Sequence, residues 1–406
     1  MTAPLFLYDD ARARTFEPFA LTRPACELRA GAEIVRRRWE RALGVPASGF
    51  LGAPHLAAFQ ELDAPPFAAG PLPAGAIVAN ARFAPRLAAT DREADVWRSG
   101  GRVAAVRLAG PATATRFETG ELALDALSAG DGRGAGIEGW WADEVWHYLR
   151  DLDAQLADDV ALLGPTLDAE PAAGATVLGK HPAYVERGAT LEPFVVLDAS
   201  AGPILIRRGA VVHAFTRLAG PCYVGEHAVI LGDRVSGCSI GEMAKVRGEI
   251  SASIVLGHSN KGHAGFVGHS YLGRWVNLGA GTTTSNLKNT YGSVALWTPQ
   301  GVRDTGMQFL GAFVGDHAKT GIGLRLTTGC VVGAGANVYD AMPPKVVPPF
   351  AWGGGAPYGT YALDKFLHVA ERVMARRHVA LGDGTRRALA AAHERRWEPA
   401  LPRRED

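Results

Sequence analysis

The segment from Ser259 to Asn286 contains residue types that could support proton transfer. It carries His263 and His269, six residues apart, together with Asn277 and several glycines, and it has few residues that favour a helix. Because an imidazole titrates near neutral pH, a histidine held in place can act as a general base. The segment therefore predicts a site in which a rigid, non-helical scaffold positions a base.

The scaffold around this segment shows a period of six. Aliphatic residues recur at that spacing, with one threonine, at Val185, Leu191, Leu197, Ile206, Val212, Leu218, Val224, Ile230, Val314, Thr320, Leu326, Val332 and Val338. A helix would repeat every 3.6 residues and an alternating strand every two, whereas a three-sided coil places one aliphatic residue inward on each face. The spacing predicts a left-handed parallel β-helix of hexapeptide repeats. The alternative is a β-sandwich with coincidental spacing.

The first part of the chain has the pattern of an α/β, Rossmann-like domain. Short apolar runs bounded by Gly and Pro suit buried parallel strands, and they cover residues 4–10, 75–83 and 102–110. Apolar residues at helical spacing predict helices over 25–44, with Gly44 as C-cap, over 137–164, and in the C-terminal tail over 361–397. The predicted divisions are an α/β domain (1–166), a linker (167–176), a β-helix (177–345) and a C-terminal extension with a helix (346–406).

Composition narrows the class of protein. A net charge of +1 and a hydrophobic fraction of 47% over 406 residues argue against binding of nucleic acid through bulk charge. We interpret Arg36, Arg37 and Arg38 as a solvated helix face. Scattered cysteines, and the lack of a leader or of a membrane-length apolar run, favour a reduced, cytoplasmic protein without a membrane partner. Since the first lysine is Lys180, anion binding in the first half would use arginine or backbone N–H groups.

The segment from Ser259 to Asn286 resembles the acetyltransferase signature of the bifunctional GlmU family. That family acetylates glucosamine 1-phosphate and uridylylates the product. The residues that match its pattern without a gap are Ser259, His263, Phe266, Gly268, Val276, Asn277, Gly279, Ala280, Gly281, Thr282 and Asn286. The resemblance implies acetyl-CoA as co-substrate and an amino-sugar 1-phosphate as acceptor.

The resemblance also implies roles for single residues. His263 takes the place of the general base, and Glu249 that of the acid that polarises it. The positions near the sugar phosphate are Asn277, Phe266, Arg247 and Lys261, and those along the acetyl-CoA channel are Ala280, Asn286, Asp316 and Ala334. Family lysines that follow the acid are absent, so Lys245, Arg247 or Lys261 could contact the phosphate. His269 matches no role and is interpreted as structural, and for His263 a turn histidine without chemistry is the alternative.

Residues 16–35, "FEPFALTRPACELRAGAEIV", resemble the start of sugar-1-phosphate nucleotidyltransferases. No Gly-rich loop precedes them, and Arg82 lies where a magnesium-binding aspartate is usual. These departures, with the block "GHSYLGRWVNLGA", resemble an alternative GlmU-like group associated with Bacteroidetes. The resemblance implies nucleotide or phosphate binding by Arg23, Arg29, Asn80 and Arg82, and Mg²⁺ binding by Asp9 or Asp10. The alternative is a repurposed domain that binds a sugar nucleotide or serves assembly.

Three functions stay open on the sequence. The first is a bifunctional enzyme that uses UTP or another NTP to make UDP-N-acetylglucosamine or a related nucleotide sugar for the cell envelope. The second is a nucleotidyltransferase whose β-helix is structural, and the third is a non-catalytic sugar-nucleotide-binding or scaffold protein. The β-helix acyltransferases that the chain resembles are trimers with sites between subunits, so we expect a homotrimer.

Overall fold

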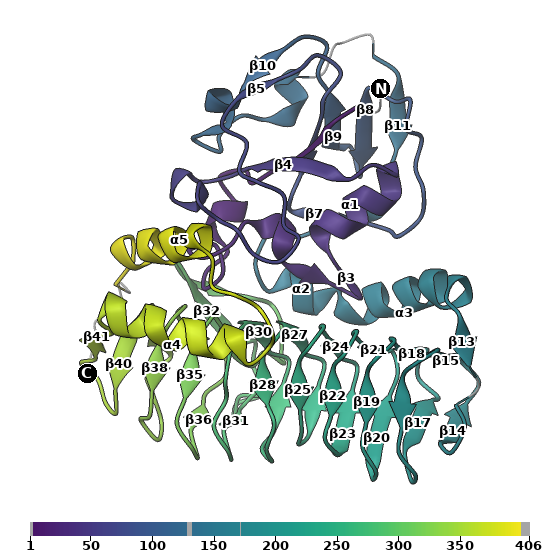
Figure 1. Ribbon diagram of the computed structural model, residues 1–406, viewed down its shortest axis with the longest axis vertical. Helices are drawn as coiled ribbons and strands as arrows, with labels where there is room; N and C mark the ends of the chain where they lie inside the picture. The colour runs from purple at the N-terminus through teal and green to yellow at the C-terminus, as the bar shows by residue number, and fades with distance from the viewer. Residues whose placement is uncertain (1–2, 128–131, 171, 399–406) are drawn as a thin grey trace. The chain divides into compact units, whose positions relative to one another are not determined.

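The computed structural model describes residues 3–127, 132–170 and 172–398 and divides into two compact units (Figure 1). Unit 1 comprises Met1–Phe16, Ala20–Tyr148 and Leu381–Arg395, and unit 2 comprises Glu17–Phe19, Leu149–Ala380 and Arg396–Asp406. The division into 1–166, 167–176, 177–345 and 346–406 stays a prediction. Residue 171 of the predicted linker and residues 399–406 of the predicted extension lie outside the described residues.

Unit 1 is built on a mixed sheet with the strand order β11-β8-β9-β6-β1-β4. These strands are β11 (Gly134–Gly136), β8 (Val96–Ser99), β9 (Arg102–Arg107), β6 (Ile77–Asn80), β1 (Leu5–Tyr8) and β4 (Ala47–Leu51). β1 runs parallel to β4 and β6, but β9 is antiparallel to β6 and β8, so a parallel strand over 102–110 was a wrong prediction. Gly100 and Gly101, both at positive φ, close a tight hairpin between β8 and β9, and a hairpin forces the antiparallel direction. Short two-stranded pairs complete the unit, formed by β5 (Pro71–Leu72) with β10 (Ala112–Thr113), β7 (Phe83–Pro85) with β12 (Gly139–Trp141), and β2 (Arg29–Ala30) with β3 (Glu33–Ile34).

The helices of the first 166 residues are shorter than predicted. Of 25–44 only α1 (Val35–Leu43) is α-helical, and it ends at Gly44 in the left-handed region, which confirms the predicted C-cap. The predicted helix over 137–164 forms α2 (His147–Arg150) and α3 (Leu152–Leu163). Arg36 and Arg38 are buried, so the solvated face was wrong for both. Arg36 pairs with Glu27 at 2.6 Å, and Arg38 donates to the Ala30 and Pro85 carbonyls.

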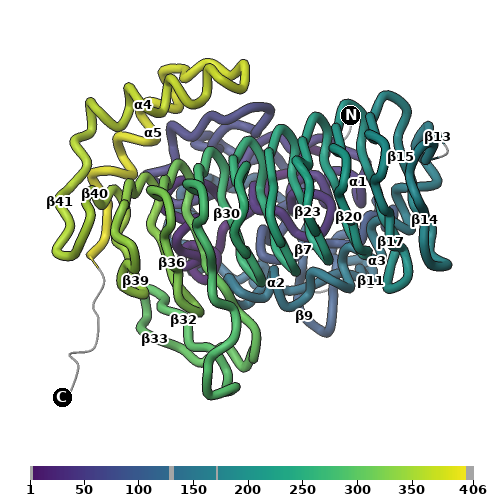
Figure 2. The backbone as a smooth tube through the Cα atoms, turned by 90° about the horizontal axis from the view of Figure 1, so that it is seen from below, coloured from purple at the N-terminus to yellow at the C-terminus, as the bar shows by residue number. Residues whose placement is uncertain are grey.

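Unit 2 is a left-handed parallel β-helix whose coils stack side by side (Figure 2). The first face holds β13 (Ala169–Glu170), β15 (Ala183–Glu186), β18 (Ile204–Ile206), β21 (Cys222–Val224), β24 (Ser239–Ile240), β27 (Ile254–Gly257), β30 (Tyr271–Arg274), β34 (Phe313–Val314), β37 (Val331–Val332) and β39 (Val346–Val347). The second holds β14 (Thr176–Gly179), β17 (Val196–Ala199), β20 (Thr216–Ala219), β23 (Asp233–Ser236), β26 (Ile250–Ser251), β29 (Val267–Gly268), β31 (Thr283–Thr284) and β36 (Arg325–Leu326). The third holds β16 (Thr190–Leu191), β19 (Val211–Val212), β22 (Val229–Ile230), β25 (Lys245–Val246), β28 (Asn260–Lys261), β35 (Lys319–Thr320), β38 (Asn337–Val338), β40 (Ala351–Gly353) and β41 (Gly359–Thr360).

The residues that recur every six positions form the inward-facing core of this coil. The predicted aliphatic positions pack into one apolar cluster, with Leu191 at its partly exposed end, and Thr320 is also buried. Each coil places its inward residue directly above that of the preceding coil, as in the register Val212↔Ile230↔Val246. This arrangement confirms the predicted β-helix, and it makes the corners between faces the places where side chains can turn outward.

One hairpin and one helix are added to the coils. β32 (Ala295–Thr298) and β33 (Gly301–Asp304) form a hairpin that projects from the β-helix in Figure 2. The predicted tail helix forms two helices, α4 (Leu363–Ala375) in unit 2 and α5 (Asp383–Glu394) in unit 1. Phe366 of α4 packs against Phe350 of the coil at a ring separation of 5.0 Å. Within the described residues, no helix combines the length and the apolar character that crossing a bilayer requires.

Candidate functional site

His263 lies at a corner of the β-helix, where the chain turns from β28 on the third face to β29 on the second. Its side chain is exposed, not in the apolar core. The turn depends on Gly265 at φ +127°, where a Cβ atom would come within 2.3 Å of the Thr282 carbonyl oxygen. Stacked coils hold this corner from both sides, which is the rigid support that a positioned base needs.

A shallow pocket of about 580 Å³ opens beside this corner. It is lined by Arg217, Asp233, Arg234, Gly248, Glu249, Ala264, Gly265 and Phe266. Two predicted site residues, Glu249 and Phe266, thus meet in one pocket, whose lining also includes Ala264, the residue after His263. Among the described residues no hydrogen bond joins Glu249 to His263, which belong to successive coils. The pocket offers two carboxylates and two basic side chains, and the corner beside it carries the His263 imidazole.

The remaining predicted sugar-phosphate positions differ in exposure. Asn277 lies on the outer side of the third face, and its Oδ1 accepts a hydrogen bond of 2.9 Å from Asn260 Nδ2. Arg247 is exposed and lies 3.3 Å from Asp233, a residue that lines the pocket. Both side chains are therefore placed where a ligand could reach them.

Lys261 points into the β-helix instead. It takes the inward place above Val246, is 1% exposed, and its Nζ donates to the carbonyl oxygens of Arg247 and His263. Burial lowers the pKa of Lys261 from 10.5 to about 8. The structure does not support Lys261 as a phosphate ligand, because the ammonium already bonds to the backbone of two successive corners. Its spacing of six from Val255 and from Val267 is the signal that could have predicted the inward orientation.

The four predicted acetyl-CoA positions separate into two pairs. Ala280 and Asn286 are half-exposed, whereas Asp316 and Ala334 are 2% and 1% exposed. Asp316 uses Oδ1 to accept the Arg274 N–H at 2.7 Å, which is a structural role inside unit 2. Within unit 2, the Pro18 carbonyl and the Ala334 backbone lie close to Gly315, which helps to explain why Ala334 is covered. The structure brings the first pair to the surface and not the second.

His269 has a partner that the sequence did not indicate. Its Nδ1 lies 2.9 Å from Asn286 Nδ2, and its ring stacks on Phe309 with a centroid distance of 5.3 Å. Burial lowers the pKa of His269. The histidine therefore fixes the orientation of Asn286, in keeping with its interpretation as a structural residue.

Unit 1 gathers its polar residues where two adjacent parallel strands end. Asp10 follows β1, and Asn80 and Arg82 lie at the end of β6, so the three share the carboxyl edge of the sheet. Both Asp10 oxygens accept hydrogen bonds from Arg82, at 2.6–2.9 Å, and Asn80 Nδ2 donates to Oδ2 at 2.9 Å. Burial alone would raise the pKa of Asp10, but the bonds from Arg82 and its charge hold it below the usual value.

A pocket of about 290 Å³ lies at this edge, and its lining includes residues that sequence reasoning missed. Arg12 and Arg102 line it with Trp141, and the Arg102 guanidinium lies 3.8 Å from the centre of the Trp141 ring. Asp143 joins Arg82 and Arg102 through hydrogen bonds of 2.7–3.0 Å. Because Arg12 and Arg102 are 49% and 41% exposed, they are the guanidinium groups here that a phosphate could reach.

The other predicted residues of unit 1 lie away from this pocket lining. Arg23 is 1% exposed and bonds Glu61 at 2.9 Å, and Arg29 is 3% exposed and donates to the Ala32 carbonyl. Both oxygens of Asp9 lie 3.1 Å from the Ala25 N–H, and burial raises the pKa of Asp9 to about 7. Neither arginine has the exposure that the predicted phosphate contact requires.

The residues predicted to hold Mg²⁺ do not fit that ion. Asp10 is neutralised by Arg82, and Asp9 is buried against a backbone N–H group. Across residues 3–127, 132–170 and 172–398, no group of three or more His, Cys, Asp or Glu side chains is arranged to hold a metal ion. Hard carboxylate oxygens free for coordination are what Mg²⁺ binding requires, and these two aspartates are engaged otherwise.

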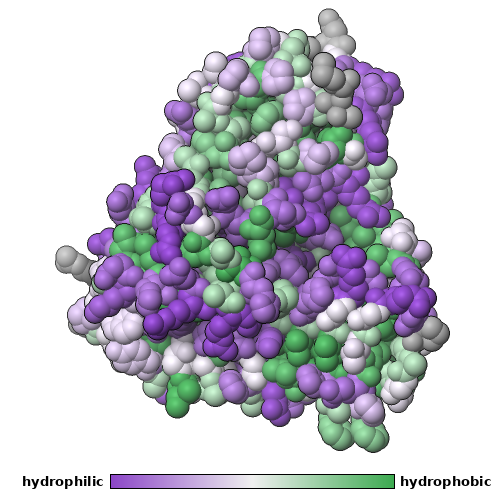
Figure 3. All heavy atoms as spheres, in the orientation of Figure 1, coloured by the Kyte–Doolittle hydropathy of each residue, from purple (hydrophilic) through white to green (hydrophobic). Residues whose placement is uncertain are grey.

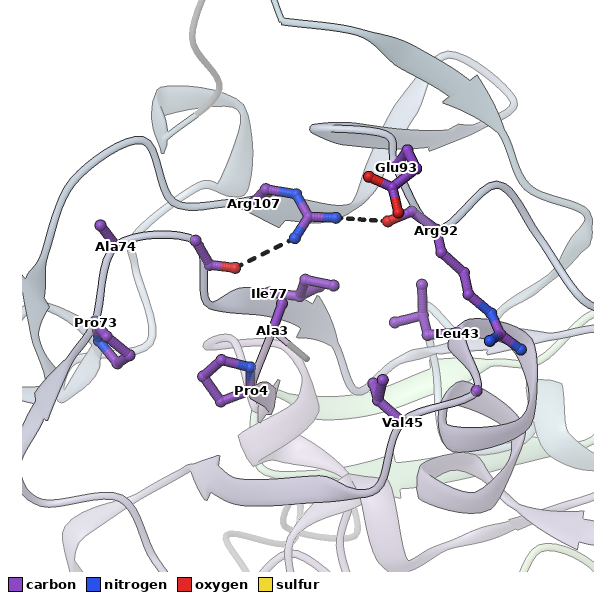
Figure 4. Close-up of a pocket in the computed structure, with 12 residues that line it drawn as sticks. Ala3, Pro4, Leu43, Val45, Pro73, Ala74, Ile77, Arg92, Glu93 and Arg107 are labelled. Atoms are coloured by element: carbon purple, nitrogen blue, oxygen red, sulfur yellow. Dashed lines mark hydrogen bonds between the residues drawn. The ribbon is translucent and has the colours of Figure 1, made fainter. Parts of the chain in front are cut away.

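A larger pocket of about 800 Å³ lies at the opposite, amino edge of the same sheet (Figure 4). Apolar side chains line most of it, including Pro4, Leu43 and Ile77. The Arg107 guanidinium, drawn at its margin, donates to the Gly75 and Arg92 carbonyls. Because Arg107 is occupied in holding these loops, we assign this pocket no chemistry.

Comparison with known proteins relates the chain to sugar nucleotidyltransferases. Residues 5–166 match the sugar nucleotidyl transferase family. A stretch of 91 residues is 34% identical to the bifunctional sugar-1-phosphate nucleotidylyltransferase/acetyltransferase of Sulfurisphaera tokodaii, covering 22% of this chain and 23% of the relative. The bifunctional protein GlmU of Desulfitobacterium hafniense is 28% identical over 198 residues, which cover 42% of this chain and 40% of the relative. That of Bartonella quintana is 25% identical over 205 residues, covering 48% and 38%. The chain thus spans less than half the length of these relatives.

Proposed function

Since the chain is a GlmU-like protein with a left-handed β-helix, we propose that it is a transferase with two reactions. Unit 2 transfers an acetyl group from acetyl-CoA to the amino group of an amino-sugar 1-phosphate. Unit 1 transfers a nucleotidyl group from UTP or another NTP to a sugar 1-phosphate. The observation that carries the proposal is the exposed His263 corner beside a pocket that contains Glu249 and Phe266.

In the proposed acetyl transfer, His263 removes the proton that the amino group must lose before its nitrogen attacks the thioester carbon. The new C–N bond forms as the C–S bond breaks, and CoA leaves as a thiol. Glu249 lines the neighbouring pocket on the preceding coil and adds a negative charge beside the corner. Asn277 orients the sugar, and Asn286, held by His269, borders the path of the acetyl donor.

In the proposed nucleotidyl transfer, Arg12 and Arg102 bind phosphate oxygens, while Arg82 and Asp10 fix the pocket wall between them. Guanidinium groups suit this task because they bind phosphate through paired N–H donors. Asn80 contributes to the wall through its bond to Asp10. We derive no step through Mg²⁺, since the predicted aspartates do not fit it.

UDP-N-acetylglucosamine or a related nucleotide sugar for the cell envelope is the product that these two reactions favour together. A homotrimer in the cytoplasm is the expected form of the protein, with neighbouring copies completing the acetyl-transfer sites. The trimer is supported by the resemblance of the β-helix to those of trimeric acyltransferases.

The test measures two products with the whole protein. Thiol release from acetyl-CoA is followed against a panel of amino-sugar 1-phosphates, and pyrophosphate release is followed with UTP and other NTPs. Both signals are expected. Pyrophosphate release without thiol release would leave a nucleotidyltransferase with a structural β-helix, and ligand binding without either product would leave a scaffold protein.

Replacing Lys261 with methionine should keep the β-helix folded but slow acetyl transfer. Methionine fills the same inward space, yet the corner carbonyls of Arg247 and His263 lose their donor. A misplacement of about 1 Å at a catalytic group costs up to about 10²-fold in rate. We expect kcat to fall and KM to stay, and Lys180→Met, at an exposed lysine of unit 2, is the control.

The same variant has a distinct pH signature. Because the folded pKa of Lys261, about 8, lies below its ordinary 10.5, the folded state binds fewer protons between these values. The free energy of unfolding of the wild type should therefore rise with pH in this window relative to that of Lys261→Met. Parallel stability curves for the two proteins would contradict the buried position of Lys261.

A further inference from the structure

The third face of the β-helix carries an outward column of residues that changes character along the coils. Successive strands place Val211, Val229, Lys245, Asn260, Asn277, Lys319 and Asn337 in register. The first two are apolar, and Figure 3 shows an apolar patch over β19 and β22. From Lys245 to Asn337 every residue of this series carries an amide or an ammonium group, and the next residue in register is Trp352. The polar part of the column coincides with the coils that hold His263 and Asn277.

Lys319 is the unusual member of this column. It is half-buried, and its Nζ donates to the His317 carbonyl oxygen at 2.9 Å. Nowhere in the described ranges does a carboxylate pair with it. Burial lowers the pKa of Lys319 to about 8, and it therefore stays mostly protonated at neutral pH. An ammonium that is partly removed from water without a counter-ion is costly, and a bound anion would offset that cost.

The neighbours of Lys319 can add donors for such an anion. Asn277 and Lys319 pair directly across adjacent strands, which lie about 4.8 Å apart in a sheet. Because Asn277 Oδ1 already accepts from Asn260, its amide nitrogen is the end that can donate outward. Gly279 and Gly321, two residues further along the two coils, add no side chain over this surface. The Lys319 ammonium and the Asn277 amide thus belong to paired positions on one face of the β-helix.

We propose that Lys319 and the amide of Asn277 form an oxyanion subsite on the third face that takes the phosphate of the amino-sugar 1-phosphate. The proposal deepens the function given above and rests on it. Phosphate monoester oxygens match a charged ammonium and a neutral amide donor at this spacing. The acceptor would then lie along the column, with its phosphate on the coil after Asn277 and its amino group toward the corner of His263.

The experiment compares wild type, Lys319→Met and Lys319→Arg, with Lys180→Met, at an exposed lysine of unit 2, as control. The KM values for glucosamine 1-phosphate and for acetyl-CoA are measured, and binding of glucosamine 1-phosphate and of glucosamine is followed by calorimetry. Loss of one charge-assisted contact should raise KM and Kd for the phosphorylated sugar about 10- to 100-fold in Lys319→Met. Lys319→Arg and Lys180→Met should stay near wild type, and glucosamine binding should not change.

Three results would overturn the proposal. An unchanged KM and Kd for glucosamine 1-phosphate would remove Lys319 from the site. A rise in KM for acetyl-CoA alone would assign the lysine to the donor, and an equal loss for glucosamine would show that it does not contact the phosphate. If neither the wild type nor any variant releases thiol, the proposed acetyl transfer is wrong. The calorimetric difference between glucosamine 1-phosphate and glucosamine then still tests whether Lys319 binds the phosphate.

Discussion

Replacing His263 with alanine should reduce acetyl transfer by about 10²- to 10⁴-fold, the range that a general base contributes. The expected loss lies in kcat, because the imidazole acts on the proton that leaves during attack and contributes little to binding of either substrate. The side chain is exposed at a corner, so its removal creates no cavity and should not destabilise the β-helix. Thiol release from acetyl-CoA with the preferred amino-sugar 1-phosphate measures the effect.

His213 provides a matched control for this variant. It lies at the same kind of corner, between β19 and β20, and its Nδ1 is 2.9 Å from Glu192. His213→Ala should retain acetyl transfer, and both variants should retain pyrophosphate release by unit 1. If His263→Ala kept the full kcat, the corner would be a turn without chemistry, and acetyl transfer would need another base.

The β-helix could be predicted because its constraint is local and repeated. One inward residue per face must be apolar and small enough to pack inside the coil. Aliphatic residues at a spacing of six therefore reveal the β-helix in the sequence. The same rule could have placed Lys261 inside, but its charge suggested a ligand contact. The position of His263 at a turn of the scaffold could be predicted from the motif in residues 259–286. The burial of Asp316 and Ala334 could not, because it depends on residues distant in sequence.

Unit 1 was predictable in its strands and less so in its pocket. The apolar runs marked β1, β6 and β9, but only the two-glycine hairpin fixes the direction of β9. Asp10 and Arg82 are 72 residues apart, and Arg102 and Asp143 are 41 apart, so their pairing requires the folded sheet. No local pattern distinguishes the exposed Arg102 from the buried Arg36 and Arg38.

Replacing Arg82 with methionine should strongly destabilise unit 1. Arg82 and Asp10 have side chains 9% and 17% exposed and lie 2.6 Å apart. Removing one partner of a buried pair costs about 3–5 kcal/mol, because the other charge is left uncompensated. Since the chain has two units, hydrogen exchange at the amides of β1 and β6 is the suitable measurement, and it should show faster opening there than in the β-helix.

The stability lost in Arg82→Met should depend on pH, because the pKa of Asp10 is lowered in the folded protein. A carboxylate with a depressed folded pKa contributes stability above its ordinary value of 3.8, and that contribution disappears as the pH falls through the folded pKa. The difference between wild type and Arg82→Met should therefore be largest near neutral pH and shrink below about pH 4.

Arg102→Met tests the proposed phosphate contact separately from the structural role of the Arg82–Asp10 pair. Its side chain is 41% exposed, so loss of its pair with Asp143 should change stability by at most about 1 kcal/mol. Nucleotidyl transfer should nevertheless fall, because the guanidinium at the pocket is gone. If Arg102→Met kept full pyrophosphate release while Arg82→Met opened β1 and β6, the pair of Arg82 and Asp10 would hold the sheet edge together around a pocket that binds no nucleotide.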